Sequence, residues 1–264
     1  MTRSNKQDLL RWSAWFVLAA LFAVACVFLS RWQFDRRAQV VAQIQIVRTN
    51  YDAQPVEVES LVSRTSDSTQ LKYRPVTLSG HYLPEKYLLV RNRANSGTPG
   101  FELLVPFVSK QTWIVDLGWI PTGTKQDFPD EIPVPSSEPT SITARLYPSE
   151  PGSNRTAPAH EVQEINIPEV QRLAQIESNG DWYLQLVHTE GTSKLPAPIE
   201  KPSTDEGSHL SYAFQWIAFA TLAIWFFFYA LRKELQIAAG KRSIKVNKPS
   251  RANLDNQAED SAQL

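Results

Sequence analysis

The chain of 264 residues contains one cysteine and one methionine. Cys26 has no second cysteine to pair with, so an intramolecular disulfide, a C-x-x-C redox pair and a thiolate zinc cluster are all excluded. Met1 is the sole methionine, which excludes soft ligation of copper by thioethers. The sequence therefore predicts a protein that neither performs thiol redox chemistry nor delivers copper.

Lysine and arginine do not outnumber the acidic residues over the whole chain or over its long middle segment. The 27 Lys and Arg balance the 27 Asp and Glu over the whole chain. Residues 31–211 carry 17 Lys and Arg against 22 Asp and Glu, whereas the rest carries 10 against 5. Because nucleic-acid binding needs a clustered basic surface, this acidic middle segment predicts no nucleic-acid partner.

Motifs of catalysis are missing as well. The chain has no G-x-S-x-G elbow, H-E-x-x-H helix, P-loop or G-x-G-x-x-G turn. His81, His160 and His188 have no ligand spacing, and Asp116 lies alone within an expected strand. The adjacent Asp130 and Glu131 fall in a proline-rich loop, where solvated charge is the simpler interpretation. We expect no enzyme activity, and a membrane-anchored hydrolase ranks last among the possible functions.

Two uncharged runs carry much of the hydrophobic content. Trp12 to Leu29 has 18 residues and Ala213 to Leu231 has 19. As helices rising about 1.5 Å per residue, both are long enough to cross a hydrocarbon core of about 30 Å. Ser30 to Gln33 offers no small-x-small cleavage site, so the first run is expected to be a retained anchor. Aromatic residues typical of membrane interfaces flank the runs: Trp12, Trp15, Trp32, Tyr212, Trp216, Trp225 and Tyr229.

Basic residues predict the orientation of the two spans. Seven follow the second run, namely Arg232, Lys233, Lys241, Arg242, Lys245, Lys248 and Arg251, and none lies between Ser203 and Ser211. The positive-inside rule therefore places both termini in the cytoplasm. The eleven residues before the first run lack the pattern of a mitochondrial presequence. We expect a multi-pass protein of the bacterial cell (inner) membrane, in contact with membrane lipid.

Between the spans, the pattern changes to short runs rich in β-branched and aromatic residues. Expected strands are Tyr73 to Ser79, Tyr87 to Asn92, Phe101 to Val108, Thr112 to Gly118, Ile142 to Tyr147 and Trp182 to His188. Their close spacing favours antiparallel pairing. Pro168 to Glu177 predicts a helix, and Arg36 to Val47 predicts that the first span continues as an amphipathic helix.

These elements predict a membrane protein of the α+β class, with two transmembrane helices flanking a mainly antiparallel β outward-facing domain. The expected divisions are a cytoplasmic N-terminus (1–11), transmembrane helix 1 (12–29), an extracytoplasmic α+β domain (30–211), transmembrane helix 2 (213–231) and a cytoplasmic tail (232–264). The tail is basic at first and polar from Ser250 to Leu264, where we expect disorder.

His209 is the most promising candidate for chemistry. It precedes the second run, and on a helix it shares one face with Tyr212, Ala213 and Trp216. An imidazole at this boundary has two interpretations. It can ligate the iron of a haem whose ring lies among the aromatic side chains, or it can simply anchor the end of the helix. Position alone favours the anchor.

Gln215 is a polar residue just inside the second run. An amide there is costly unless it is paired, so it is expected to face the first span or a partner protein. Gln33 and Arg36, near the outer end of the first span, are its natural partners within this chain. Arg36 has a second candidate role, which is to hold a haem propionate. The alternative for both residues is ordinary interfacial anchoring.

Five segments in order resemble the surfeit locus family of cytochrome c oxidase assembly factors. They are Trp32-Gln33-Phe34-Asp35-Arg36-Arg37; Tyr73-Arg74-Pro75-Val76 with Gly80-His81-Tyr82; Asn92-Arg93 with Gly97-Thr98-Pro99-Gly100-Phe101; Trp113-Ile114-Val115-Asp116-Leu117-Gly118-Trp119-Ile120-Pro121; and His209-Leu210-Ser211-Tyr212-Ala213-Phe214-Gln215-Trp216. Together with the two-span architecture, the resemblance covers residues 32 to 220.

The resemblance implies a non-catalytic chaperone that assists haem a insertion into the largest subunit (subunit I) of cytochrome c oxidase, a respiratory-chain enzyme, alongside other assembly factors. The family's histidine corresponds to His209, the metal-ligand candidate, and its Trp-Gln-x-x-Arg to Trp32, Gln33 and Arg36. With Tyr212, Gln215 and Trp216 they form the expected haem-binding set, with haem a held transiently during transfer.

Two segments depart from the pattern that the resemblance implies. Asp116-Leu117 stands where the family commonly has an Asn-Arg pair, and Ser30-Arg31 replaces a glycine that often precedes Trp-Gln. The first departure weakens a functional role for Asp116. The alternative function is a membrane-tethered, protein-binding scaffold that makes no contact with haem.

Overall fold

The computed structural model describes residues 3–62, 68–191 and 194–246. The chain divides into two compact units, Met1–Val40 with Glu206–Leu264, and Val41–Asp205. The second unit therefore begins and ends inside the expected extracytoplasmic segment of residues 30–211. The expected disorder from Ser250 to Leu264 lies outside the described residues.

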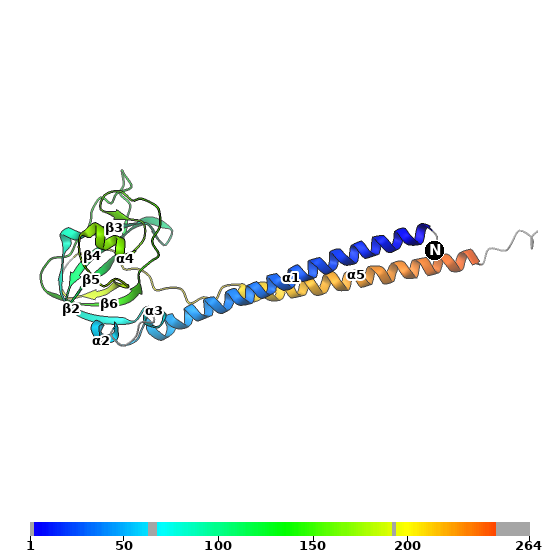
Figure 1. The fold of residues 1–264 in the computed structure, drawn as a ribbon, viewed down its shortest axis with the longest axis horizontal. Helices are drawn as coiled ribbons and strands as arrows, with labels where there is room; N and C mark the ends of the chain where they lie inside the picture. The colour runs from blue at the N-terminus through cyan, green and yellow to red at the C-terminus, as the bar shows by residue number, and fades with distance from the viewer. Residues whose placement is uncertain (1–2, 63–67, 192–193, 247–264) are drawn as a thin grey trace, which may run out of the picture. The chain divides into compact units, whose positions relative to one another are not determined.

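The first unit is a helical hairpin built from α5 (His209–Val246) and from α1 (Arg3–Asn50) as far as Val40 (Figure 1). The end of α1, from Val41, belongs to the second unit. No Gly or Pro interrupts the sequence between the ends of α1, so its hydrogen-bonding ladder is unbroken. Contacts of Arg11 with Glu234 and of Gln33 with His209 show that the two helices run antiparallel. Both helices are long and apolar enough to cross a membrane. The predicted continuation of the first helix over Arg36 to Val47 is confirmed, and the helix ends at Asn50.

Small side chains form the contact between the two helices. Ala23, Cys26 and Ser30 are buried on α1, and Ala213 and Ala220 are buried on α5. They recur at spacings of three, four or seven residues, which place them along one stripe of each helix. Small residues let two backbones approach closely, and this is the usual way in which apolar helices pack. Trp216 packs against this cluster. We call this contact the hairpin seam.

The second unit is built on one eight-stranded sheet. Its strands are β1 (Val56–Glu57), β2 (Pro75–Tyr82), β3 (Leu88–Asn95), β4 (Thr98–Val108), β5 (Thr112–Pro121), β6 (Thr140–Pro148), β7 (Glu161–Val162) and β8 (Trp182–Thr189). Their order is β1-β2-β6-β8-β5-β4-β3-β7. An additional pairing of β2 with β4 closes the five strands β2, β6, β8, β5 and β4 into a barrel.

All six expected strands are present, as β2 to β6 and β8. The sheet is mixed, however: β1–β2, β3–β7 and β5–β8 pair in parallel, while the other pairings are antiparallel. Parallel pairing of β5 with β8 is possible because β6 and α4 (Ile167–Ala174) lie between them in the chain. β1 and β7 have two residues each, too few to show a period in the sequence.

The alternating strand pattern creates two apolar cores. Trp113, Phe107 and Tyr82 belong to the larger cluster, and Ile114 and neighbouring residues on the opposite face belong to the smaller one. Residues of α4 cover the smaller cluster. The side chain of Asn166 accepts a hydrogen bond from the backbone N–H of Glu169 and so begins α4.

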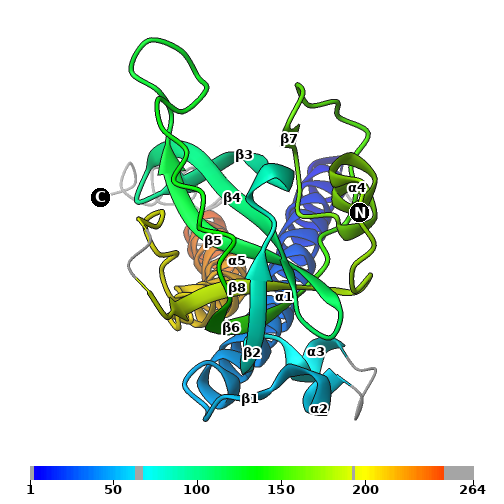
Figure 2. The same cartoon turned by 90° about the vertical axis from the view of Figure 1, so that its left-hand side faces the viewer.

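Short helices lie beside the first strands. They are α2 (Val58–Val62), α3 (Ser68–Leu71) and a 3-10 turn at Pro84–Lys86. Figure 2 shows α2 and α3 next to β1 and β2. Val58 of α2 is fully buried and Leu71 of α3 nearly so, and both join the larger apolar cluster. These helices therefore seal one side of the barrel.

Candidate functional site

The hairpin seam ends in a pair of polar residues. His209 is the first residue of α5, and its Nδ1 lies 2.9 Å from Oε1 of Gln33 on α1. Both side chains are partly buried. Gln33 lies on the same stripe of α1 as Ser30 and Cys26, so the packing of the small residues brings the amide to the imidazole. We call this end of the hairpin, at His209 and Gln33, the hairpin mouth.

An ion pair lies one turn further along α1. Arg37 Nη2 and Glu206 Oε2 are 2.6 Å apart, with both side chains partly exposed. The neighbouring Arg36 is exposed and donates a hydrogen bond to Gln39 Oε1 of its own helix at 3.1 Å. Its guanidinium retains donors for another group. The guanidinium of Arg37 is therefore paired with Glu206, whereas that of Arg36 can still bind an anionic ligand.

Aromatic side chains lie within about two helical turns of Gln33 or His209 and are largely open. Trp32 is 58% exposed and Tyr212 is 48% exposed. Phe34 and Phe214 contact each other edge to face across the two helices, with ring centroids 6.0 Å apart. Trp216 is half-buried against the seam. This region offers a planar apolar ligand several ring faces that the protein itself does not cover.

Gln215 lies apart from this group. Its side chain is exposed, and none of the described residues forms a hydrogen bond with it. Gln215 follows the buried Ala213 by two residues, which turns it about 200° around α5, away from the seam. The expected pairing of Gln215 with Gln33 or Arg36 is therefore not formed, since Gln33 bonds to His209 and Arg36 to Gln39. The sequence identifies these polar residues but not the register that pairs them.

The donor set at the hairpin mouth fits a haem better than a bare metal ion. Within the described part of the chain, no three His, Cys, Asp or Glu side chains are grouped to hold a metal ion. A haem brings four nitrogen ligands of its own and needs an axial ligand from the protein. His209 supplies one ring nitrogen beyond the one occupied by Gln33. The exposed rings and Arg36 suit a porphyrin and its propionates.

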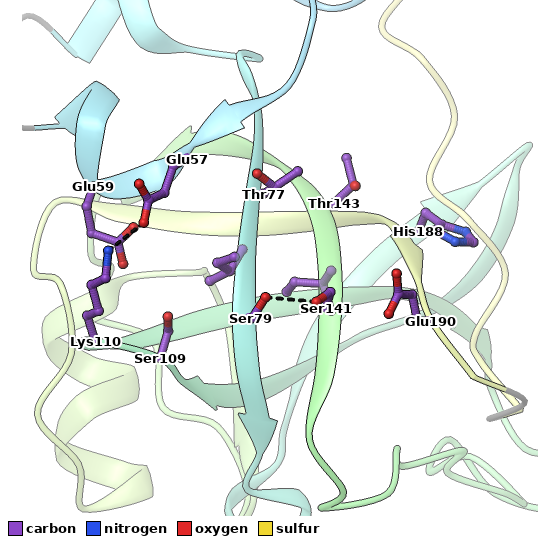
Figure 3. Close-up of a pocket in the computed structure, with 12 residues that line it drawn as sticks. Glu57, Glu59, Thr77, Ser79, Ser109, Lys110, Ser141, Thr143, His188 and Glu190 are labelled. Atoms are coloured by element: carbon purple, nitrogen blue, oxygen red, sulfur yellow. Dashed lines mark hydrogen bonds and ion pairs between the residues drawn. The ribbon is translucent and has the colours of Figure 1, made fainter.

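A polar trough of about 610 Å³ lies on the second unit (Figure 3). Hydroxyls of Thr77 and Ser79 on β2, and of Ser141 and Thr143 on β6, form its floor. The Ser79 and Ser141 hydroxyls are 2.8 Å apart. Successive side chains of a strand point to opposite faces of the sheet. These four residues therefore point outward, and their neighbours along the strands point into the barrel.

Charged residues line the sides of this trough. Lys110 Nζ is 2.5 Å from Glu57 Oε1, and Glu59 lies beside them, while His188 and Glu190 stand at the other side. Among the described residues, His188 forms no hydrogen bond with a hydroxyl of the floor. A proton relay from serine to histidine is therefore not assembled, and the trough offers hydrogen bonds and negative charge to a polar partner.

A second polar cluster, whose members sequence reasoning did not bring together, is partly buried in the sheet near the fully buried Asp116. Arg93 on β3 contacts Glu102 on β4 at 3.1 Å and Glu150 at 2.5 Å. Burial raises the pKa of Asp116 on β5 well above its usual range, and the charge of Glu102 adds to the effect. Burial also raises the pKa of the Glu102 carboxyl, against the attraction of Arg93. The available signal was a charged residue inside an apolar strand, as at Glu102 between Phe101 and Leu103.

Comparison with known proteins identifies relatives along most of the chain. Residues 20–221 match the sequence model of the SURF1 family. An uncharacterized SURF1-like protein of Mycobacterium tuberculosis is 32% identical over 223 residues, covering 80% of each chain. A SURF1-like protein of Rickettsia bellii is 21% identical over 210 residues, or 75% of this chain and 82% of the relative. The cytochrome oxidase assembly protein SHY1 of Saccharomyces cerevisiae is 29% identical over 110 residues, or 39% of this chain and 28% of the relative.

Proposed function

The chain belongs to the SURF1 family, and from this premise we propose that it is an assembly factor for cytochrome c oxidase that assists insertion of haem a into the largest subunit. The relative SHY1, named as a cytochrome oxidase assembly protein, supports the oxidase as client. The observation that carries the haem step is the contact of His209 with Gln33, which engages one ring nitrogen and leaves the other for a ligand.

In this proposal the hairpin mouth holds haem a while it is in transfer. Haem supplies redox-active iron and a long apolar tail, which must be kept out of water. His209 Nε2 would coordinate the iron, Trp32, Tyr212 and Trp216 would contact the ring, and Arg36 would pair with a propionate. The protein binds and orients the group and then releases it. No bond of a substrate is made or broken, so the role is that of a chaperone rather than an enzyme.

The proposed location is a bacterial inner membrane. The large apolar side chains of α1 and α5 face outward, as those of a membrane helix do, whereas a core helix of a soluble protein would bury them. The excess of basic residues after the second span supports cytoplasmic termini. A carrier anchored this way can pass haem laterally to an integral membrane subunit, in company with other oxidase assembly factors and membrane lipid.

The experiment replaces the proposed ligand. His209→Ala and His209→Gln are purified from cells that make haem a, and the ratio of haem to protein is compared with that of the wild type. We expect both variants to lose bound haem, because neither side chain replaces an imidazole as an axial ligand. His188→Ala is the matched control, since this exposed histidine lies on β8 in the second unit. An unchanged ratio in His209→Ala would exclude the ligand assignment.

The polar trough favours one alternative function. A groove with hydroxyls and carboxylates but without an assembled proton relay suits a protein-binding scaffold that has no contact with haem. Deleting the gene separates the two functions. A haem a chaperone predicts that the haem a band disappears from the reduced-minus-oxidised spectrum of the membranes. A scaffold without haem contact predicts that the haem a band remains in the deletion strain and that the purified wild-type protein carries no haem.

A further inference from the structure

The contact between Gln33 and His209 bears on which ring nitrogen of the imidazole carries the proton. The atom of Gln33 that faces His209 Nδ1, at 2.9 Å, is the amide oxygen. An amide oxygen only accepts hydrogen bonds, so Nδ1 must be the donor. In a neutral imidazole that carries its proton on Nδ1, Nε2 has a free lone pair. With the amide oxygen in this position, the contact favours the tautomer of His209 that is protonated on Nδ1.

Nothing else in the described part of the chain bonds to the ring of His209. Arg37 on α1 and Glu206, which precedes α5 in the chain, bond to each other. Ser30 and Ala213, one turn below on α1 and α5, are buried in the seam. Selection of the tautomer thus rests on one side chain, which the seam holds in place from the other helix.

We infer that Gln33 is a positioning residue, which fixes the Nδ1-protonated tautomer of His209 and directs an unprotonated Nε2 toward the iron. The inference rests on the proposed function, because it gives Nε2 its ligand. Histidine ligands of metals nearly always donate their second N–H to a neighbouring acceptor, which fixes the tautomer and the ring orientation. An amide is an acceptor without charge. It therefore suits a position between two apolar helices better than a carboxylate does.

The first measurement needs no haem. Full-length protein is labelled with 15N histidine, purified free of haem in detergent, and studied at pH 8, above the ordinary histidine pKa of about 6.5. Long-range proton–nitrogen spectra distinguish protonated from unprotonated ring nitrogens. Among the signal sets of the four histidines, that of His209 is identified by its loss in His209→Gln. We expect Nδ1 to be protonated in the wild type and a mixture of tautomers in Gln33→Leu.

The second measurement is the affinity of the same proteins for purified haem a. Removal of an outer-shell partner typically costs about 10- to 100-fold in metal affinity, and we expect this loss in Gln33→Leu. Gln33→Glu retains an oxygen acceptor at the same place, so it should retain both the tautomer and the binding. Glu206→Gln is the matched control, because it removes the neighbouring ion pair with Arg37 and leaves the contact of Gln33 in place.

The outcomes separate this inference from the function on which it rests. A wild-type protein with the proton on Nε2, or a Gln33→Leu variant with unchanged tautomer and affinity, would overturn the role of Gln33. Equal losses in Gln33→Leu and Glu206→Gln would also overturn it, since the contact would then serve only the stability of the hairpin. Failure of the wild type to bind haem a would instead remove the proposed function, with the tautomer still measured in the haem-free protein.

Discussion

Asp116 Oδ1 accepts a hydrogen bond from the backbone N–H of Gly118, 3.1 Å away and two residues along the same strand. Gly118 has a φ of 130°, which lies in the region that favours glycine. Asp116 is only 1% exposed, and this contact does not offset its burial. Its pKa is raised, first by burial and then by the charge of Glu102. The protonated carboxyl is therefore the form that the folded sheet favours.

The stability of the sheet should consequently fall as the pH rises. A carboxyl with a raised pKa in the folded state stabilises the fold below its unfolded pKa of about 3.9, and this contribution is lost as the pH rises through the folded pKa. Asp116→Asn has no proton to lose. We expect its free energy of unfolding to depend less on pH and to exceed that of the wild type at neutral pH. A residual slope should remain, because the pKa of Glu102 is also raised.

Denaturant unfolding of the full-length protein in detergent at several pH values measures this slope. Asp127→Asn is the control, since it makes the same change in an exposed loop. Equal slopes in the wild type and in Asp116→Asn would show that Asp116 is ionised in the folded protein, contrary to this prediction.

Local patterns predicted the strands, whereas long-range contacts could not be predicted. The β-branched and aromatic residues between Thr112 and Gly118 are visible in the sequence, and they located β5 correctly. The parallel pairing of β5 with β8 joins Val115 to Leu184, and no local signal specifies such a partner. The same reason explains why the cluster around Arg93 was missed.

In the candidate site, too, the residues could be predicted from local patterns but their contacts could not. Interfacial position and residue type are enough to single out His209 and Gln33 in the sequence. Their contact joins residues 176 positions apart, so it depends on the register of two helices. That register is set by the small residues of the seam, whose role was not predicted. Gln215 was placed with the wrong partners for this reason.

Close packing at the seam should not tolerate a larger side chain at Ala220. Ala220 is buried against Ala23 and Cys26. Overpacking of a well-packed interface typically costs about 1–3 kcal/mol, so Ala220→Leu should push α1 and α5 apart. Spin labels at the exposed Leu9 and Leu235, in a Cys26→Ser background, report the separation of the helices. Ala218→Leu makes the same change on an exposed position of α5 and should leave the distance unchanged. A widening as large in the control would show that the seam is not the site of packing.

The proposed topology predicts opposite results for two enzyme fusions. Alkaline phosphatase is active only outside the cytoplasm, and the basic residues after the second span favour a cytoplasmic C-terminus. A fusion after Leu264 should be inactive and a fusion after Gly152, in the loop that follows β6, should be active. Fusion protein levels are compared by immunoblot. The reverse pattern of activity would invert the orientation, place His209 on the cytoplasmic side and contradict the proposed location of haem transfer.

We expect the exposed amide of Gln215 to form a hydrogen bond with a partner protein rather than to contact haem. It lies in the apolar part of α5, on the side away from the seam, and no described residue pairs with it. Polar side chains in membrane helices gain about 1–2 kcal/mol from pairing with another helix, which corresponds to roughly 5- to 30-fold in affinity. Gln215→Leu should therefore weaken co-purification of the largest oxidase subunit by about this factor, while the haem to protein ratio stays at the wild-type value.

Two measurements on the same preparations show whether the Gln215 amide contributes to binding of the client subunit or of haem. Haem is quantified from the absorption spectrum of the purified protein, and the client subunit is quantified by immunoblot of the same eluate. Gln43→Leu is the matched control, because it replaces another exposed glutamine, on α1 beyond the apolar run. If Gln215→Leu lowered the haem ratio and left the client unchanged, the amide would belong to the hairpin mouth despite its position. If both values fell together only in this variant, haem retention would depend on the bound client, and the two roles would be coupled through α5.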